Sequence, residues 1–247
     1  MKDILNKIMQ SLDFKHAVRS LKKLEYSLNT PESRFAIPFV YRSRGFYKII
    51  TPLQTPSEFE LLYREIIKIK PKSTLEIGTA QGGTLYLWCQ ACASNAKIVS
   101  VDLPGGKFGG GYSNERAKLY QAFARDKQEL HLLRENSHTE STQEKVKNIF
   151  IGENIDYLFI DGDHTYEGVK NDFLAYGKMV RPGGLIVLHD VMPAIHNPEI
   201  EVNRLWEQIK KCFSTKEYCF EDRKGRKLGL GLISVPEEGF PTINEFN

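Results

Sequence analysis

The chain has 247 residues, of which 41% are hydrophobic and 26% are charged, and its formal net charge is +3. These values are typical of globular proteins, the charge is too small to indicate nucleic-acid binding, and no apolar run is long enough to predict a transmembrane helix. The charged start does not resemble a secretory signal, and the four cysteines do not suggest a disulfide framework, so we expect a cytoplasmic protein.

Residues 1–54 are predicted to form a helical extension ahead of the main domain, residues 55–247. Within residues 1–27, apolar residues recur at helical spacing between lysines, which predicts amphipathic helices packed on the domain. A substrate lid, a dimer arm and a membrane-surface helix stay open as alternatives. Residues 28–54 are rich in prolines and aromatic residues, which predicts an irregular connector whose aromatic side chains either line a substrate pocket or simply pack.

The main domain is predicted to begin with a helix, because Thr55-Pro56-Ser57-Glu58 has the features of a helix start. Thr55 would be the N-cap, proline is favoured at the first helical position, and Glu58 would complete a capping box. Apolar residues then recur at helical spacing as far as Ile69, and Pro71 ends the helix.

A strand, a glycine turn and a helix are predicted for residues 73–92. The strand is the short apolar stretch 73–77, the turn contains Gly78 and Gly82, and apolar residues at helical spacing follow. A glycine turn lets the backbone approach a ligand where a Cβ atom would clash, and the start of the helix offers free N–H groups. The pattern therefore predicts a ligand site at this turn.

Two residues at or beside the turn indicate which ligand binds there. A dinucleotide-binding turn reads G-x-G-x-x-G, and Ala80 stands where its second glycine would let a pyrophosphate approach. Glu76 is at the end of the strand, and a carboxylate there would repel phosphates but suit a cationic ligand. Both features argue against NAD, although a glycine turn of some other α/β enzyme stays open.

At this point the sequence resembles the class I S-adenosylmethionine-dependent methyltransferases, whose first motif is Glu-x-Gly-x-x-x-Gly. Glu76, Gly78 and Gly82 match that motif. The resemblance implies that S-adenosylmethionine binds at these residues and at Thr79 and Ala80 in the same turn.

The second predicted strand, residues 96–103, ends in Asp102 and Leu103. An acidic residue at this point can accept hydrogen bonds from both ribose hydroxyls, so we assign Asp102, with Leu103 beside it, to the cofactor site. Residues 104–112 contain five glycines and form either a lid over the ligand or a slack surface loop.

The third predicted strand, residues 129–134, leads to Ser137, which we place near the expected adenine pocket. Ser141 and Glu144 then have the spacing of a second capping box, which predicts the start of another helix.

Two polar clusters follow the fourth and fifth predicted strands. Residues 155–161 lead into Asp161-Gly162-Asp163-His164. After a helix and an Arg-Pro-Gly-Gly turn at residues 181–184, the strand 185–188 leads into His189-Asp190. Because the carboxyl ends of neighbouring parallel strands form the edge that holds the ligand in an open α/β sheet, we expect the two clusters to lie together.

The end of the chain predicts one more amphipathic helix and an antiparallel hairpin, residues 217–222 and 227–235, that turns at Lys224-Gly225. A parallel sheet closed by such a hairpin is the arrangement of the methyltransferases that the sequence resembles. We therefore expect an α/β fold, with a Rossmann-like, seven-stranded, mostly parallel sheet, a C-terminal antiparallel hairpin and an N-terminal helical extension.

The sequence from Ile155 to Asp190 resembles the methyltransferase family that includes macrocin-type O-methyltransferases and cephalosporin-cluster relatives. In those relatives a divalent metal is held by the aspartate that ends strand four and an acidic pair that ends strand five. This implies Asp161, His189 and Asp190 as ligands, with His189 in place of an acidic residue. Oxygen ligands suit Mg²⁺, while an imidazole favours Mn²⁺, Fe²⁺ or Zn²⁺. Alternatively, the two aspartates bind no metal and only form hydrogen bonds to the backbone or to the cofactor. We also assign Asp161 and Gly162 to the cofactor site.

His164 stands where catechol-type O-methyltransferases have a general-base lysine, so the resemblance implies that His164 takes the hydroxyl proton, with Asp161 beside it in the catalytic site. Histidine can do this near neutral pH, and the alternative is that His164 caps the next helix or simply packs.

The sequence thus predicts an S-adenosylmethionine-dependent, metal-assisted O-methyltransferase for a small hydroxylated acceptor, such as a sugar or a secondary metabolite. An NAD(P)-dependent oxidoreductase and a non-catalytic methyltransferase-like binding protein are the alternatives, and homo-oligomer formation stays open.

Overall fold

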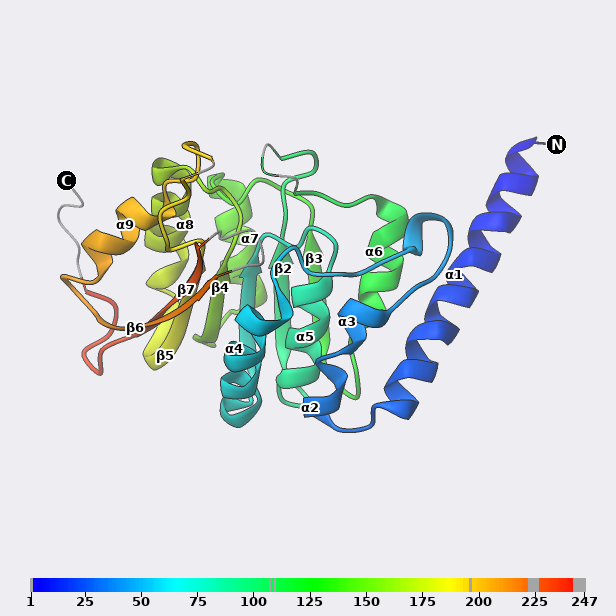
Figure 1. Ribbon diagram of the computed structural model, residues 1–247, viewed down its shortest axis with the longest axis horizontal. Helices are drawn as coiled ribbons and strands as arrows, with labels where there is room; N and C mark the ends of the chain where they lie inside the picture. Colours follow the sequence, from blue (N-terminus) through cyan, green and yellow to red (C-terminus); the bar gives the residue numbers. More distant parts are fainter. Residues whose placement is uncertain (1, 107, 109, 196, 222–226, 242–247) are drawn as a thin grey trace.

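The computed structural model describes residues 2–106, 108, 110–195, 197–221 and 227–241, and it has three layers, a seven-stranded sheet between two layers of helices (Figure 1). The strands lie in the order β3-β2-β1-β4-β5-β7-β6. Their bounds are β1 Ser73–Ile77, β2 Lys97–Val101, β3 Glu129–Leu133, β4 Ile155–Ile160, β5 Val180–His189, β6 Ser214–Glu221 and β7 Lys227–Ser234.

The sheet has the predicted Rossmann-like topology. Strands β3, β2, β1, β4 and β5 run parallel, while β7 pairs antiparallel with both β5 and β6. The central strand β1 is buried along its whole length because helices cover both faces of the sheet, and it buries Ser73, Thr74 and Glu76 as well as two apolar residues. The fold class predicted from the sequence is confirmed.

Two hydrophobic clusters fill the space on the two faces of the sheet. One joins the N-terminal extension, α4, α5 and α6 to the sheet, and the other joins α7, α8 and α9 to it. No helix in the described part of the chain is long and apolar enough to cross a membrane. The helices are α1 Lys2–Ser27, α2 Pro31–Arg34, α3 Ile37–Val40, η1 Gly45–Tyr47, α4 Pro56–Ile69, α5 Gly83–Ala91, α6 Asn114–Gln121, α7 Glu140–Ile149, α8 Tyr166–Gly177 and α9 Val202–Ile209.

Several helices were predicted for residues 1–27, but one long helix, α1, is present there, and the connector that was predicted to be irregular contains the short helices α2, α3 and η1. In the second half of α1, Ala17 and Leu21 are fully buried against the domain, so the expected packing is present there. The first half projects from the molecule at the opposite end from α9 (Figure 1) and exposes Leu5, Ile8, Met9 and Leu12. In the connector, Tyr41 and Tyr47 are buried, so these aromatic side chains pack.

Both predicted capping boxes are wrong. Helix α4 begins after Thr55, but the Thr55 side chain makes no capping hydrogen bond within the described residues, and Glu58 is turned inward and fully buried. Helix α7 is capped by Thr139, whose hydroxyl accepts a hydrogen bond from the Thr142 N–H. In α4 a tertiary contact of Glu58 replaced the predicted cap, and in α7 another local residue, Thr139, took the capping position.

The fifth strand begins earlier than predicted. The expected turn at residues 181–184 lies inside β5, where the Gly183 N–H donates to the Val235 carbonyl at 2.9 Å. The strand tolerates the Arg-Pro-Gly-Gly sequence because its register with β4 shifts near Ile155. The predicted turn at Lys224-Gly225 lies outside the described residues.

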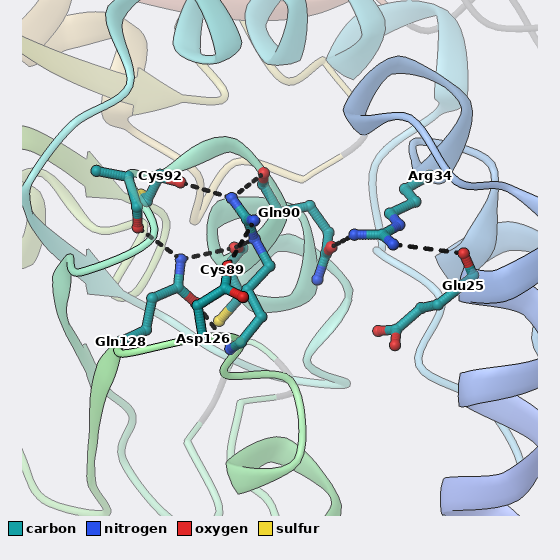
Figure 2. A network of polar contacts seen from close by, with 9 residues as sticks. Glu25, Arg34, Cys89, Gln90, Cys92, Asp126 and Gln128 are labelled. Carbon is teal, nitrogen blue, oxygen red and sulfur yellow. Dashed lines mark hydrogen bonds and ion pairs between the residues drawn. The ribbon is translucent and has the colours of Figure 1, made fainter.

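A polar network ties the N-terminal extension and the segment between α6 and β3 to the C-terminal end of α5 (Figure 2). Arg125 donates to the carbonyls of Cys89 and Cys92, both at 2.9 Å, and the Gln128 amide donates to Cys89 as well. Arg34 reaches from the extension to the Gln90 side chain at 3.0 Å. Arg125 and Gln128 satisfy carbonyls that a helix end leaves without partners, so they hold α5 in place.

Candidate active site

A cavity of about 670 Å³ opens at the carboxyl ends of the parallel strands. Its lining includes most residues that the sequence analysis assigned to the site, namely Gly78, Thr79, Ala80, Asp102, Leu103, Ser137, Asp161, Gly162, His164, His189 and Asp190. The lining does not include Glu76 or Gly82, although both lie in the described part of the chain. The predicted convergence at the sheet edge is therefore present.

The two glycines of the first motif act differently. Gly78 has φ +94°, and a Cβ atom there would come 2.0 Å from the Asp161 carbonyl oxygen, so only glycine lets β1 and β4 approach this closely. Gly82 has φ +81°, and its Cβ would lie 2.6 Å from the Tyr120 ring. Gly78 therefore shapes the cavity, whereas Gly82 allows α5 to pack against α6.

Glu76 lies beneath the cavity and is fully buried. Ser100 donates a hydrogen bond of 2.5 Å to one carboxyl oxygen of Glu76, and burial raises the pKa of Glu76 to about 8. The carboxyl group is therefore mostly protonated at neutral pH. The repulsion of phosphates that we expected from Glu76 would accordingly be weak, and its role towards a cofactor stays a prediction.

Asp102 connects the glycine turn to the glycine-rich loop. Its Oδ2 accepts hydrogen bonds from the backbone N–H groups of Ala80 at 2.8 Å and Gly111 at 3.0 Å. Further along the loop, the Phe108 ring stacks on the His164 ring at 5.0 Å between centroids. The loop thus spans the cavity from Asp102 to His164, which favours the lid interpretation over a slack loop.

The wall beside Ser137 contains a buried acidic residue that the sequence analysis missed. Asp172 of α8 is fully buried, and its Oδ1 lies 3.5 Å from Nε2 of His138, which lines the cavity. The hydrogen bond to Asp172 raises the pKa of His138 against the opposing effect of burial. The Tyr176 hydroxyl donates to the Ser137 carbonyl at 2.7 Å and fixes this wall.

Four residues from the ends of β4 and β5 form a polar cluster at the other end of the cavity. His164 Nδ1 lies 2.8 Å from Asp190 Oδ2, and His164 Nε2 lies 3.5 Å from Asp161 Oδ1. His189 Nδ1 lies 3.1 Å from Asp161 Oδ1 and 3.3 Å from Asp190 Oδ1. The Asp190 backbone has φ +59°, which is uncommon for a residue other than glycine and typical of strained functional positions.

Two further side chains join this cluster that sequence reasoning missed. The Gln54 amide donates to Asp161 Oδ2, and Glu58 Oε1 lies 3.0 Å from His189 Nε2. Gln54 carried no motif, and Glu58 resembled a capping residue. The role of Glu58 could only have been suspected from an acidic residue in a helix that packs near the strand ends.

The histidines and carboxylates of the cluster shift one another's pKa values. Burial alone would lower the pKa of His164, but its hydrogen bond to Asp190 and the charge of Asp161 raise it. The same balance raises the pKa of the buried His189, because Asp161 and Asp190 face it. Burial would raise the pKa of Asp190, but the charge of His189 and the His164 hydrogen bond lower it.

The cluster has the donor set of a divalent metal site. Ligand atoms of Asp161, His164 and Asp190 all lie within 4.8 Å of one another. His189 Nδ1 is buried without a hydrogen bond of regular geometry to the described residues and faces the same two carboxylates. Carboxylate oxygens with an imidazole nitrogen fit a small divalent cation. The helix-capping alternative for His164 is wrong, because Thr165 caps α8.

Comparisons with known proteins show what the chain is similar to. Residues 75–191 match a family model described as a methyltransferase domain. An uncharacterised protein of Acanthamoeba polyphaga mimivirus is 32% identical over 138 residues, which cover 55% of this chain and 60% of that protein. An uncharacterised protein of Sinorhizobium fredii is 25% identical over 170 residues, covering 67% of this chain and 17% of its own length. The chain thus spans less than two thirds of these relatives.

Two solved structures share the fold. An O-methyltransferase from Bacillus cereus in complex with S-adenosylhomocysteine has a TM-score of 0.55 at 16% identity, covering 88% of this chain and 90% of its own. The O-methyltransferase TomG from Streptomyces achromogenes, involved in tomaymycin synthesis and in complex with S-adenosylmethionine, has a TM-score of 0.55 at 17% identity, covering 88% and 89%. At these identities the likeness concerns the fold alone. Together with the methyltransferase-domain match over residues 75–191, it shows that the chain is similar to S-adenosylmethionine-dependent methyltransferases in the fold around the strand-end site.

Proposed function

We propose that the chain transfers a methyl group from S-adenosylmethionine to a hydroxyl group of a small acceptor. The observation that carries this proposal is the meeting of Asp161, His164 and Asp190 within 4.8 Å at the end of the cavity that begins at the glycine turn. S-adenosylmethionine supplies an electrophilic methyl group when bound. The polar cluster lies where an acceptor hydroxyl could face that group.

The residues of the first half of the cavity would hold the cofactor. Gly78, Thr79 and Ala80 would lie against it, and Asp102 would accept hydrogen bonds from the ribose hydroxyls. The wall of Ser137 would face the adenine. Holding the methyl donor and the hydroxyl in one enclosed geometry is itself a large contribution to the rate.

His164 would accept the proton of the acceptor hydroxyl. Its Nδ1 lies at hydrogen-bonding distance from Asp190, so Asp190 can hold the imidazole in the tautomer that leaves Nε2 free as the base. Asp161, His189 and Asp190, with His164 close by, would hold a divalent cation, Mg²⁺ or Mn²⁺. Such an ion lowers the pKa of a bound hydroxyl.

The acceptor would meet both apolar and polar groups. The cavity is lined by Leu53, Met192, Pro193, Ile195 and Leu228, and also by Asn197, Glu199 and Lys227. Such a wall suits a small hydroxylated acceptor such as a sugar or a secondary metabolite. We propose the cytosol as the compartment, as composition indicates.

Calorimetric titration with S-adenosylmethionine and S-adenosylhomocysteine tests the proposal. We expect both to bind, and Asp102→Ala to weaken binding by about 1–3 kcal/mol because the ribose hydroxyls lose their acceptor. Cys92→Ser, a change in the buried face of the neighbouring segment, should leave the affinity nearly intact. Tight binding of NADH, with neither sulfonium ligand bound, would revive the oxidoreductase alternative.

A further inference from the structure

A buried carboxylate that the sequence analysis did not assign to the site completes the polar cluster. Glu58 lies in the first turn of α4 and is fully buried, and its Oε1 lies 3.0 Å from Nε2 of His189, which is 131 positions away in the chain. Its other oxygen, Oε2, is buried and has no hydrogen-bond partner within the described residues. Because a buried carboxylate is costly unless it is paired, Glu58 requires an N–H donor from His189.

This contact decides which nitrogen of His189 carries a hydrogen. A carboxylate can only accept, so the ring must have its N–H on Nε2, where Glu58 lies. In the neutral imidazole the lone pair is then on Nδ1. Glu58 therefore turns the free nitrogen of His189 away from the helix and towards the ends of β4 and β5.

The free nitrogen meets two carboxylates there. Nδ1 of His189 lies 3.1 Å from Asp161 Oδ1 and 3.3 Å from Asp190 Oδ1. Three electron-rich atoms at these distances repel one another unless a proton on Nδ1 or a metal cation lies among them, and a metal ion that binds there displaces the proton. His189 is itself only 8% exposed, so water cannot screen the repulsion effectively.

We infer that Glu58 is a positioning residue that makes His189 Nδ1 a metal ligand beside Asp161 and Asp190. The inference rests on the metal site of the proposed function and deepens it. Because an imidazole nitrogen suits Mn²⁺, Fe²⁺ and Zn²⁺ better than Mg²⁺, Glu58 also biases the site towards these ions. Carboxylates that orient a metal-binding histidine in this way contribute about 10–100-fold to metal affinity.

The experiment is calorimetric titration of the full chain with MnCl₂ and with MgCl₂. Glu58→Leu removes the acceptor that holds the tautomer, so Mn²⁺ affinity should fall by about 10–100-fold. Mg²⁺ affinity, which depends on the carboxylate oxygens, should fall by less than about 3-fold. Glu58→Gln keeps a carbonyl oxygen that can accept the same hydrogen bond, so it should retain most of the Mn²⁺ affinity.

A second measurement reports the ligand itself. Electron paramagnetic resonance of bound Cu²⁺ counts the coupled imidazole nitrogens, and Glu58→Leu should show one fewer than the wild type. A residue that only tied α4 to β5 would not change this spectrum. Glu60→Gln is the matched control, because Glu60 lies on the same helix but is exposed and pairs with Arg64 at 2.7 Å. It should change neither readout.

The outcomes separate this inference from the proposed function. Equal Mn²⁺ affinity and an unchanged Cu²⁺ spectrum in a folded Glu58→Leu variant would overturn the inference. So would a wild-type protein that binds S-adenosylmethionine but no Mn²⁺, while a wild type that fails to bind S-adenosylmethionine would overturn the proposed function instead. Should Glu58→Leu not fold, Glu58→Asp, whose shorter side chain cannot reach His189, gives the same test.

Discussion

Two polar clusters of this protein differ in how their charges are balanced. At the C-terminal end of α5, the cationic donor Arg125 and the amide of Gln128 meet backbone carbonyls that need partners. At the ends of β4 and β5, three carboxylates crowd around two histidines, and Glu58 Oε2 and His189 Nδ1 are left without regular hydrogen bonds to the described residues. The first cluster supplies hydrogen-bond donors to backbone carbonyls at the helix end, whereas the second contains side-chain atoms without hydrogen-bond partners among the described residues.

The difference separates a structural role from a chemical one. A backbone carbonyl at a helix end needs a donor whether or not a ligand is bound, so the α5 cluster contributes to the stability of the folded protein. Carboxylates without hydrogen-bond partners in a closed site lower the stability of the folded protein. Proteins retain such arrangements mainly at active sites. We therefore expect substitutions in the first cluster to change stability and substitutions in the second to change activity.

The largest effect should come from Asp190→Asn. The amide cannot serve as a charged ligand and loses the charge that orients His164, so we expect turnover to fall by more than about 10³-fold while much of the S-adenosylmethionine affinity remains. Methyl transfer from labelled S-adenosylmethionine and calorimetry measure the two quantities. Chelator should reproduce the loss in the wild type, with Mg²⁺ or Mn²⁺ restoring activity. Full transfer in excess chelator would show that the carboxylates serve only the cofactor and the fold.

His164→Ala should lower the rate by about 10²–10⁴-fold, because it removes the base and leaves the aspartates in place. The pH–rate profile should lose its acidic limb at the same time. We expect the thermal unfolding temperature to change little. If the unfolding temperature fell steeply while the rate per folded molecule stayed normal, His164 would have a structural role and not a catalytic one.

Glu76→Gln should show whether the residue beneath the cavity is structural. Since the pKa of Glu76 is about 8 in the folded protein and near 4.5 in the unfolded chain, the folded state binds more protons between these values, and stability falls as pH rises through this window. Glutamine resembles the protonated form and removes this fall. Between pH 5 and pH 8 the wild type should lose about 3 kcal/mol relative to the variant in urea unfolding. Parallel pH curves would refute the shifted pKa.

Arg125→Ala should have the smallest effect of the four. It removes hydrogen bonds to carbonyls at the end of α5, so we expect a loss of about 2 kcal/mol in the free energy of unfolding. S-adenosylmethionine affinity, measured well below the unfolding temperature, should stay within about 2-fold of the wild type. Asp126→Asn removes only an exposed ion pair with Arg125 and is the control. If Arg125→Ala lost as much S-adenosylmethionine binding free energy as unfolding free energy, the α5 cluster would also contribute to the active site, and the distinction between the two clusters would be wrong.

The order of the helices and strands could be predicted because it depends on local sequence patterns. Apolar spacing distinguishes the strand of residues 73–77 from the helix after it, and the glycines between them mark the turn. Asp161 and Asp190 could be brought together from the sequence alone, because each follows a buried parallel strand and such strands end at one edge. That inference needed the topology of the sheet and no side-chain detail.

Only the tertiary structure decided which other side chains reach that edge. Glu58 and Gln54 arrive from segments 131 and 107 positions away from their partners, and nothing in their local spacing distinguishes them from a cap or a connector residue. The roles of Gly82 and Glu76 also depended on what packs against them, the Tyr120 ring in one case and a dry space beneath the cavity in the other. Periodicity specifies the conformation of a segment and the face it buries. The angle and depth at which α4 meets the sheet are set by the packing of the whole core, and they determine whether Glu58 caps a helix or holds His189.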